Sequence, residues 1–214
     1  MEWVLPAFHW GGSAMKRHFS LALLVLFVST LTGCVPEDCL FGLAGASDRE
    51  FDERLLGEWK MQSGPEFKPG EQSARILFRR SGDDPEYETT VFDFDEHGTN
   101  IVCTGRLARL GTALFVDFGT RDADEHKYAE IPFPGIEAHI FGRIYIDKNS
   151  VRIDFLSDDW VKKQATAGKL TLATVETKDG LVISAPTEQL RKFALEHAED
   201  AEAFSESFSM IRSK

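Results

Sequence analysis

The sequence has few of the features that mark an enzyme, a membrane-spanning protein or a nucleic-acid-binding protein. It contains no Gly-x-Ser-x-Gly, phosphate-loop, HExxH or CxxC motif, so no pattern predicts a catalytic centre or a cofactor. The apolar run from Leu21 to Leu31 is shorter than the roughly 20 residues that a membrane-spanning helix needs. Basic residues number 24 against 35 acidic ones, so the chain is not expected to bind nucleic acid through charge.

The segment from Met15 to Cys34 has the order of charge and hydropathy of a secretory signal. Lys16 and Arg17 precede the apolar run, and small residues end it. Residues 1–14 do not fit this pattern, so Met15 is the expected true start. The sequence therefore predicts a signal peptide over residues 1–33, and the alternative is a short anchor helix that stays attached.

The end of this segment, Leu31-Thr32-Gly33-Cys34, resembles a bacterial lipobox. The resemblance implies that Cys34 receives a diacylglycerol on its sulfur, that the chain is cut before it, and that its amine is acylated. Fatty chains such as palmitate would then hold the protein on a membrane, since two chains already suffice for stable anchoring. Val35 follows Cys34 where an Asp would imply inner-membrane retention, which favours the outer membrane, facing the periplasm, in a Gram-negative host.

The mature part has the length of one domain. Residues 34–46 are expected to form a lipidated tether, and residues 47–214 the folded domain. The hydrophobic share of 43% is typical of a packed globular protein.

Two cysteines remain once the lipid has used Cys34. Cys39 and Cys103 would lie in an oxidising compartment, where a leftover pair usually bonds, so a Cys39–Cys103 disulfide is predicted. The alternative is two unrelated thiols, with Cys103 a small buried residue on a strand.

Short alternating segments separated by turn residues predict many antiparallel strands. Val151, Ile153 and Phe155 alternate with Arg152 and Asp154, as in a strand with one buried face. Strands are expected at 74–80, 86–95, 99–110, 112–118, 137–147, 150–156, 169–177, 181–184 and 204–212. Helices are expected at 47–56, 157–167 and 187–203, the last with an apolar stripe that includes Leu190, Phe193 and His197.

An early Gly57-x-Trp59 on the first strand, followed much later by a helix before a short last strand, resembles the lipocalin/calycin group. The resemblance implies that Trp59 closes the floor of a barrel. The expected fold is mainly β: an antiparallel lipocalin-like barrel of about eight to ten strands with one C-terminal helix before the last strand. Trp160, in a short helix, is expected to contribute less to stability than Trp59.

Two acidic clusters are candidate cation sites. Asp93, Asp95, Glu96 and His97 either hold a cation or form a solvated hairpin end, and the absence of a calcium-loop register favours the hairpin end. The second cluster, in the segment RDADEHK, suits an exposed connection and contains a single histidine; its members are Asp122, Asp124, Glu125 and His126. No metal is expected.

His139 lies in a strand beside Ile140 and Phe141. It is either a polar group in a ligand cavity or a core histidine with a satisfied hydrogen bond. The sequence as a whole predicts an envelope lipoprotein that binds a small apolar ligand in a barrel cavity. The alternative is a structural or adaptor lipoprotein that docks a protein partner, and an enzyme is not expected.

Overall fold

The computed structural model describes residues 38–63, 75–92, 100–120, 138–178 and 180–213. Every described residue belongs to one compact unit within Cys34–Lys214. The elements in chain order are β1 (Arg49–Glu50), the 3-10 helix η1 (Glu53–Leu55), β2 (Gly57–Ser63), β3 (Arg75–Arg80), β4 (Glu86–Phe92), β5 (Ile101–Leu110), β6 (Ala113–Thr120), β7 (His139–Ile146), β8 (Ser150–Phe155), α2 (Asp158–Thr166), β9 (Thr174–Glu176), β10 (Leu181–Ile183), α3 (Thr187–Glu196) and β11 (Glu206–Arg212).

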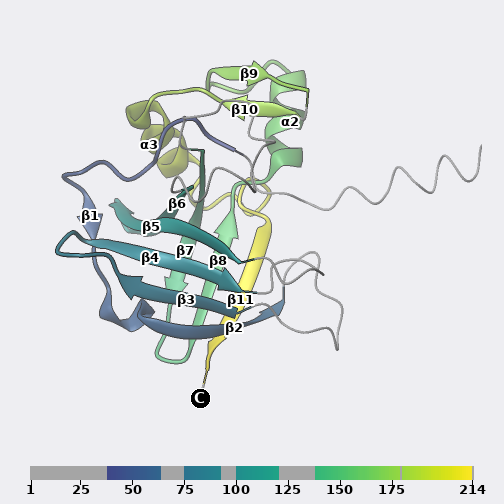
Figure 1. Ribbon diagram of the computed structural model, residues 1–214. Coiled ribbons are helices and arrows are strands. Elements are labelled where there is room, and N and C mark those ends of the chain that lie inside the picture. The colour runs from purple at the N-terminus through teal and green to yellow at the C-terminus, as the bar shows by residue number, and fades with distance from the viewer. Residues whose placement is uncertain (1–37, 64–74, 93–99, 121–137, 179, 214) are drawn as a thin grey trace, which may run out of the picture. The chain divides into compact units, whose positions relative to one another are not determined.

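Eight of these strands form a closed antiparallel barrel (Figure 1). The strand order is β5-β4-β3-β2-β11-β8-β7-β6, and pairing between β6 and β5 closes the ring. The short β1 adds to β5, where Arg49 pairs with Ala108. Closure leaves no long exposed strand edge in the ring. The predicted mainly β, lipocalin-like barrel is therefore confirmed, with α3 as the helix before the last strand.

Alternation of side chains across the barrel wall builds two hydrophobic cores. In β6, Val116 and Phe118 belong to an inner core, whereas Ala113 and Phe115 belong to an outer one. The period of two in a strand sends successive side chains to opposite faces, so each strand can serve both cores. The fully or nearly fully buried members of the inner core include Leu55, Trp59, Phe78, Tyr87, Leu107, Val151 and Met210.

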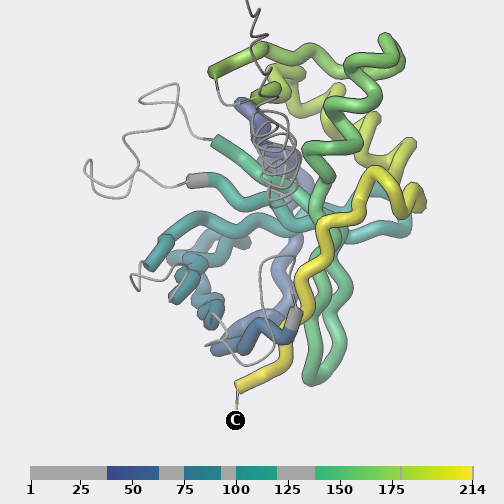
Figure 2. The backbone as a smooth tube through the Cα atoms, turned by 90° about the vertical axis from the view of Figure 1, so that its right-hand side faces the viewer, coloured from purple at the N-terminus to yellow at the C-terminus, as the bar shows by residue number. Residues whose placement is uncertain are grey.

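The outer core lies between the barrel wall and a layer made of α2, α3 and the β9–β10 hairpin. These elements gather on one side of the barrel in both views (Figures 1 and 2). Leu190 and Phe193 of α3 are buried there with Phe115 of β6, as the apolar stripe predicts. Trp160 of α2 is also buried and packs edge-on against Phe193, so its truncation is now expected to cost stability as well.

Two of the predicted helices are shorter in the structure, one because of a polar turn and the other because of strand pairing. The helix expected over 187–203 ends at Glu196, and the Asp200 carboxylate then accepts hydrogen bonds from the backbone N–H groups of Glu202 and Ala203. Asp favours such turns over helix interiors for this reason. In the segment 47–56, β1 pairs with β5, and Asp52 caps the single turn of η1 by accepting from the Arg54 backbone. Pairing with the barrel thus replaces the expected helix.

The segment from Asp38 to Ala44 is part of the fold rather than of a tether. Cys39 exchanges two backbone hydrogen bonds with His139 of β7, at 2.7 and 2.8 Å, while Ile183 of β10 bonds to both neighbours of Cys39. Cys39 and Leu43 are fully buried in the outer core. The prediction of a tether through residue 46 is therefore wrong from Asp38 onward, because this stretch has apolar residues and strand partners of its own.

Candidate functional site

One end of the barrel is closed around Trp59. Its side chain is fully buried, and the indole N–H donates to the Leu55 carbonyl at 2.8 Å. The guanidinium of Arg212, on the last strand, lies 4.2 Å from the ring centroid. Arg212 also donates to the carbonyls of Leu56, at 2.9 Å, and of Arg54. The expected burial of Trp59 is confirmed, whereas no spacing in the sequence identifies Arg212 as its partner.

Gly57 makes the close approach of Arg212 possible. Its φ of 111° lies in the region that favours glycine, and a Cβ there would come within 3.1 Å of the Arg212 Nη1 atom. The Gly-x-Trp pattern therefore has a local physical reason in this chain: the glycine leaves room for the cation that covers the tryptophan.

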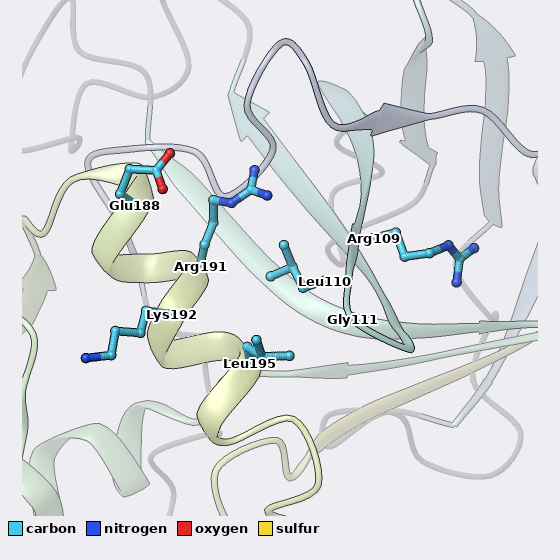
Figure 3. A pocket seen from close by; sticks show the side chains of 7 residues that line it. All are labelled: Arg109, Leu110, Gly111, Glu188, Arg191, Lys192 and Leu195. Carbon is cyan, nitrogen blue, oxygen red and sulfur yellow. The ribbon is translucent and has the colours of Figure 1, made fainter.

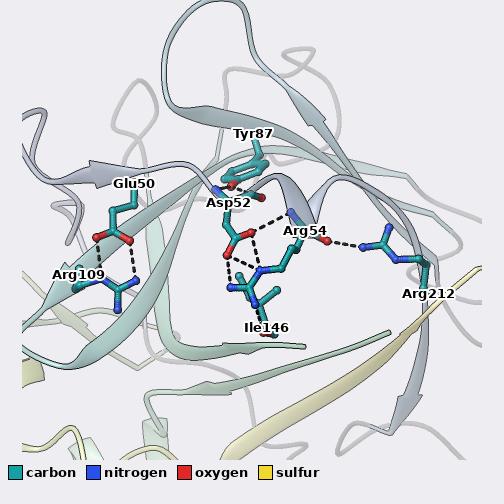
Figure 4. A network of polar contacts seen from close by, with 7 residues as sticks. All are labelled: Glu50, Asp52, Arg54, Tyr87, Arg109, Ile146 and Arg212. Carbon is teal, nitrogen blue, oxygen red and sulfur yellow. Dashed lines mark hydrogen bonds and ion pairs between the residues drawn. The ribbon is translucent and has the colours of Figure 1, made fainter. Parts of the chain in front are cut away.

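A polar network surrounds this closed end (Figure 4). The Tyr87 hydroxyl accepts from the Asp52 backbone N–H at 2.7 Å and donates to the Asp52 carbonyl at 3.1 Å. Hydrogen bonds from the Arg54 side chain hold the pKa of Asp52 below its usual value, and burial raises the pKa of Tyr87 to about 12. A second pair, Arg109 with Glu50, ties β5 to β1 at 2.7 and 2.8 Å. These contacts hold the closed end together.

At the opposite end of the barrel, inward-facing apolar side chains keep part of their surface exposed. Four such residues lie close to the strand termini at this end. Ile76, Ile140 and Phe208 are near the starts of β3, β7 and β11, and Val91 is next to last in β4, which runs in the opposite direction. All four pack on the inner core and are only half-buried. Chain direction places these strand ends together, and Ile76 is the cross-strand neighbour of Trp59 on β2. Inner-core residues at the Trp59 end, Phe51, Leu56, Leu114 and Ile146, are likewise half-buried. The segments that join the strands at the end with Ile76 and Phe208, residues 64–74, 93–99 and 121–137, lie outside the described residues, and we term this end the open end.

The barrel interior also contains polar atoms. Thr89 of β4 is buried, and its hydroxyl has no hydrogen-bond partner. Cys103 is its neighbour on β5, and burial raises the pKa of this thiol to about 12. Glu206, the first residue of β11, is buried opposite Phe155 of β8. A buried polar group without a partner is uncommon, so the Thr89 hydroxyl is a candidate for a ligand contact.

His139 lies outside the barrel interior, so its placement in the predicted barrel cavity is wrong. Its strand neighbour Ile140 packs on the inner core, while Phe141 belongs to the outer one, and the period of two places His139 on the outer face with Phe141. Its Nδ1 atom lies 2.9 Å from the Asp117 carboxylate, and both residues are buried. The Ala44 backbone N–H donates to the same carboxylate at 3.1 Å. The alternative of a satisfied core histidine fits this arrangement.

The predicted Cys39–Cys103 disulfide does not form. Cys39 is buried in the outer core and Cys103 in the inner one. Cys39 pairs with His139 of β7, and two strands, β7 and β6, separate its segment from β5, which carries Cys103. Three strand spacings amount to about 14 Å, twice the Cα separation of about 7 Å that a disulfide tolerates. The alternative of two unrelated thiols holds.

A shallow groove of about 360 Å³ lies on the outside, between α3 and the β5–β6 turn (Figure 3). Leu195 of α3 contributes an apolar wall and is 52% exposed. The groove is lined by Arg109, Leu110, Gly111, Glu188, Arg191, Lys192 and Leu195. Arg191 pairs with Asp48, and Arg109 pairs with Glu50, so these cations are already partnered.

Several predicted residues lie outside the described part of the chain. They include Cys34 with the signal segment 1–33, the cluster from Asp93 to His97, and the cluster from Asp122 to His126. Within the described residues, no group of three or more His, Cys, Asp or Glu side chains could hold a metal ion. No helix among the described residues is long and apolar enough to cross a bilayer.

The chain matches no protein-family model, no curated protein and no solved structure.

Proposed function

We propose that this protein binds a small apolar ligand at the open end of its barrel, while a lipid on Cys34 holds it in the bacterial cell envelope. The observation that carries the proposal is the partial exposure of inward-facing Ile76, Val91, Ile140 and Phe208. Covering apolar surface contributes roughly 25 cal/mol per Å², so a ligand that covers these side chains gains affinity. A barrel mouth is also a common place for small-molecule sites.

Thr89 supports a ligand with one polar group. Small-molecule sites usually combine apolar walls with a few placed polar atoms that orient the ligand. The Thr89 hydroxyl is such an atom, since it is buried in the barrel without a hydrogen-bond partner. Its neighbour across the strand pair, Cys103, is a poor competitor for that bond because a thiol is a weak acceptor.

The ligand proposal can be tested with the apolar fluorescent probe N-phenyl-1-naphthylamine. The wild-type mature domain should enhance the probe's fluorescence, and Ile140→Glu should abolish the enhancement because a charge then lies at the open end. Ile211→Glu is the matched control, since Ile211 is also partly exposed but alternates outward from Met210 on β11. Equal enhancement by the Ile140→Glu variant and wild type would exclude the open end as the site.

The anchor requires a separate test. Cys34→Ala should prevent both signal cleavage and incorporation of labelled palmitate, because the sulfur that accepts the lipid is gone. The Cys34→Ala protein should then run at precursor size in cells that process the wild type. Labelling of the Cys34→Ala variant at mature size would contradict the proposal.

A second candidate function is that of an envelope adaptor, which the outer groove favours. The groove exposes Leu195 beside paired cations, a combination that suits a protein surface better than a small apolar molecule. Native mass spectrometry of the protein from its own membrane distinguishes the two. A bound protein that is lost in Leu195→Glu supports the adaptor, and a bound small molecule that is lost in Ile140→Glu supports ligand binding.

A further inference from the structure

The folded part of the chain begins very close to the proposed lipid anchor. Three residues separate Cys34 from Asp38, whose carbonyl already accepts a hydrogen bond from Ile183 of β10 at 2.9 Å. The four Cα-to-Cα steps from Cys34 to Asp38 span at most about 14 Å when extended. A lipid on Cys34 would therefore hold this side of the domain within that distance of the bilayer surface.

An exposed aromatic side chain lies in this same segment. Phe41 is 47% exposed, although its neighbours Cys39 and Leu43 are fully buried. Hydrogen bonds to the main chain hold it on both sides of Phe41: the Leu40 N–H donates to the Ile183 carbonyl at 2.8 Å, and the Gly42 carbonyl accepts from the Thr187 hydroxyl at 2.7 Å. The outward position of Phe41 is thus fixed by the fold and does not depend on the tether.

We infer that Phe41 inserts into the lipid surface beside the anchor, so that the side of the domain formed by Asp38–Ala44 faces the bilayer. Linkage to the membrane by a short chain gives the ring a high effective concentration at the surface, so a contact too weak to bind alone becomes populated. Aromatic side chains are also well suited to the region between lipid headgroups and water. The inference rests on the proposed lipidation of Cys34 and adds the orientation of the domain to it.

Tryptophan fluorescence can test this orientation in the lipidated protein. The predicted mature chain contains two tryptophans, Trp59 and Trp160, and both are buried, so the wild type supplies a constant baseline. The full precursor with Phe41→Trp is processed in cells, purified and reconstituted into phosphatidylcholine vesicles with brominated acyl chains. We expect the fluorescence added by Phe41→Trp to be strongly quenched by these lipids.

Ile211→Trp is the matched control. Ile211 is 38% exposed, close to the value for Phe41, but it pairs with Ser150 at the other end of the barrel wall. His139 and Ile146 mark the two ends of β7 and lie about 23 Å apart along the strand. The fluorescence added by Ile211→Trp should therefore be unaffected by the brominated lipids.

The two proposals fail in different ways. If lipidated wild-type protein floats with the vesicles and the mature domain without lipid does not, the anchor is supported, and an unquenched Phe41→Trp then overturns the orientation alone. If neither protein floats, the anchor is wrong and the orientation falls with it. Equal quenching of Phe41→Trp and Ile211→Trp also overturns the orientation, because the domain would then have no preferred face toward the lipid.

Discussion

The guanidinium of Arg212 covers the ring of Trp59 at 4.2 Å while it donates to two backbone carbonyls of the chain that leads into β2. The contact joins the last strand to the first barrel strand, 153 positions earlier in the numbering. It therefore closes the sheet and one end of the barrel at the same point, and the protein's stability should be sensitive to it.

Arg212→Ala should lower the free energy of unfolding by about 2–3 kcal/mol. The change removes a cation–π contact of about 0.5–2 kcal/mol and leaves two backbone carbonyls without a donor. Arg212→Lys should restore only part of this loss, because an ammonium group cannot reproduce the planar fork of donors. Urea unfolding followed by circular dichroism measures both. Arg152→Ala, at an exposed arginine above Tyr145, is the control and should change stability little.

Gly57→Ala should destabilise the protein more than Gly82→Ala. Both glycines have positive φ, of 111° and 62°, and alanine is strained at such angles. A Cβ at Gly57 would also press on Arg212 at 3.1 Å, whereas nothing lies within 4 Å of a Cβ at Gly82. We expect a loss of about 1 kcal/mol for Gly82→Ala and a larger one for Gly57→Ala. Equal midpoints in urea for the two variants would contradict the account of Gly57.

Trp59→Ala and Trp160→Ala should each lower stability by about 3–5 kcal/mol, the usual cost of truncating a large buried aromatic residue. The two residues belong to different cores, inside and outside the barrel. Their effects should therefore be nearly additive in the double variant, as is usual for distant sites. Thermal unfolding by circular dichroism provides the measurement, and a strongly non-additive double variant would indicate that the two cores are coupled.

Alkaline pH should lower the free energy of unfolding because two buried groups, Tyr87 and Cys103, resist ionisation in the folded state. Burial raises the pKa of both Tyr87 and Cys103 to about 12, whereas unfolded chains have values of about 10 and 8.5. The folded state therefore favours the protonated forms. The stabilisation that this preference brings is complete below about pH 8.5 and is lost as the pH rises toward 12.

Urea unfolding at pH 8, 10 and 11 tests this prediction. Tyr87→Phe should lose less stability than the wild type between pH 10 and 11, because it no longer has a buried phenol to ionise. Tyr145→Phe, on the outside of β7, is the control and should follow the wild type.

Sequence patterns were sufficient for the barrel and most of its strands because strand formation depends on local alternation. Val151, Ile153 and Phe155 identify a strand and share a face whatever surrounds them. The Gly57-x-Trp59 pattern likewise identifies the closed end, because it spans only three consecutive positions. The apolar stripe that includes Leu190 and Phe193 identifies α3.

Long-range contacts determined the rest. The wall strands β6 and β7 are apolar on both faces, since each packs on an inner and an outer core, so alternation alone could not tell on which face His139 lies. The distance between Cys39 and Cys103 depends on two strands that lie between them. The partnership of Arg212 with Trp59 exists only once the ring of strands closes, because only closure brings the two ends of the domain together.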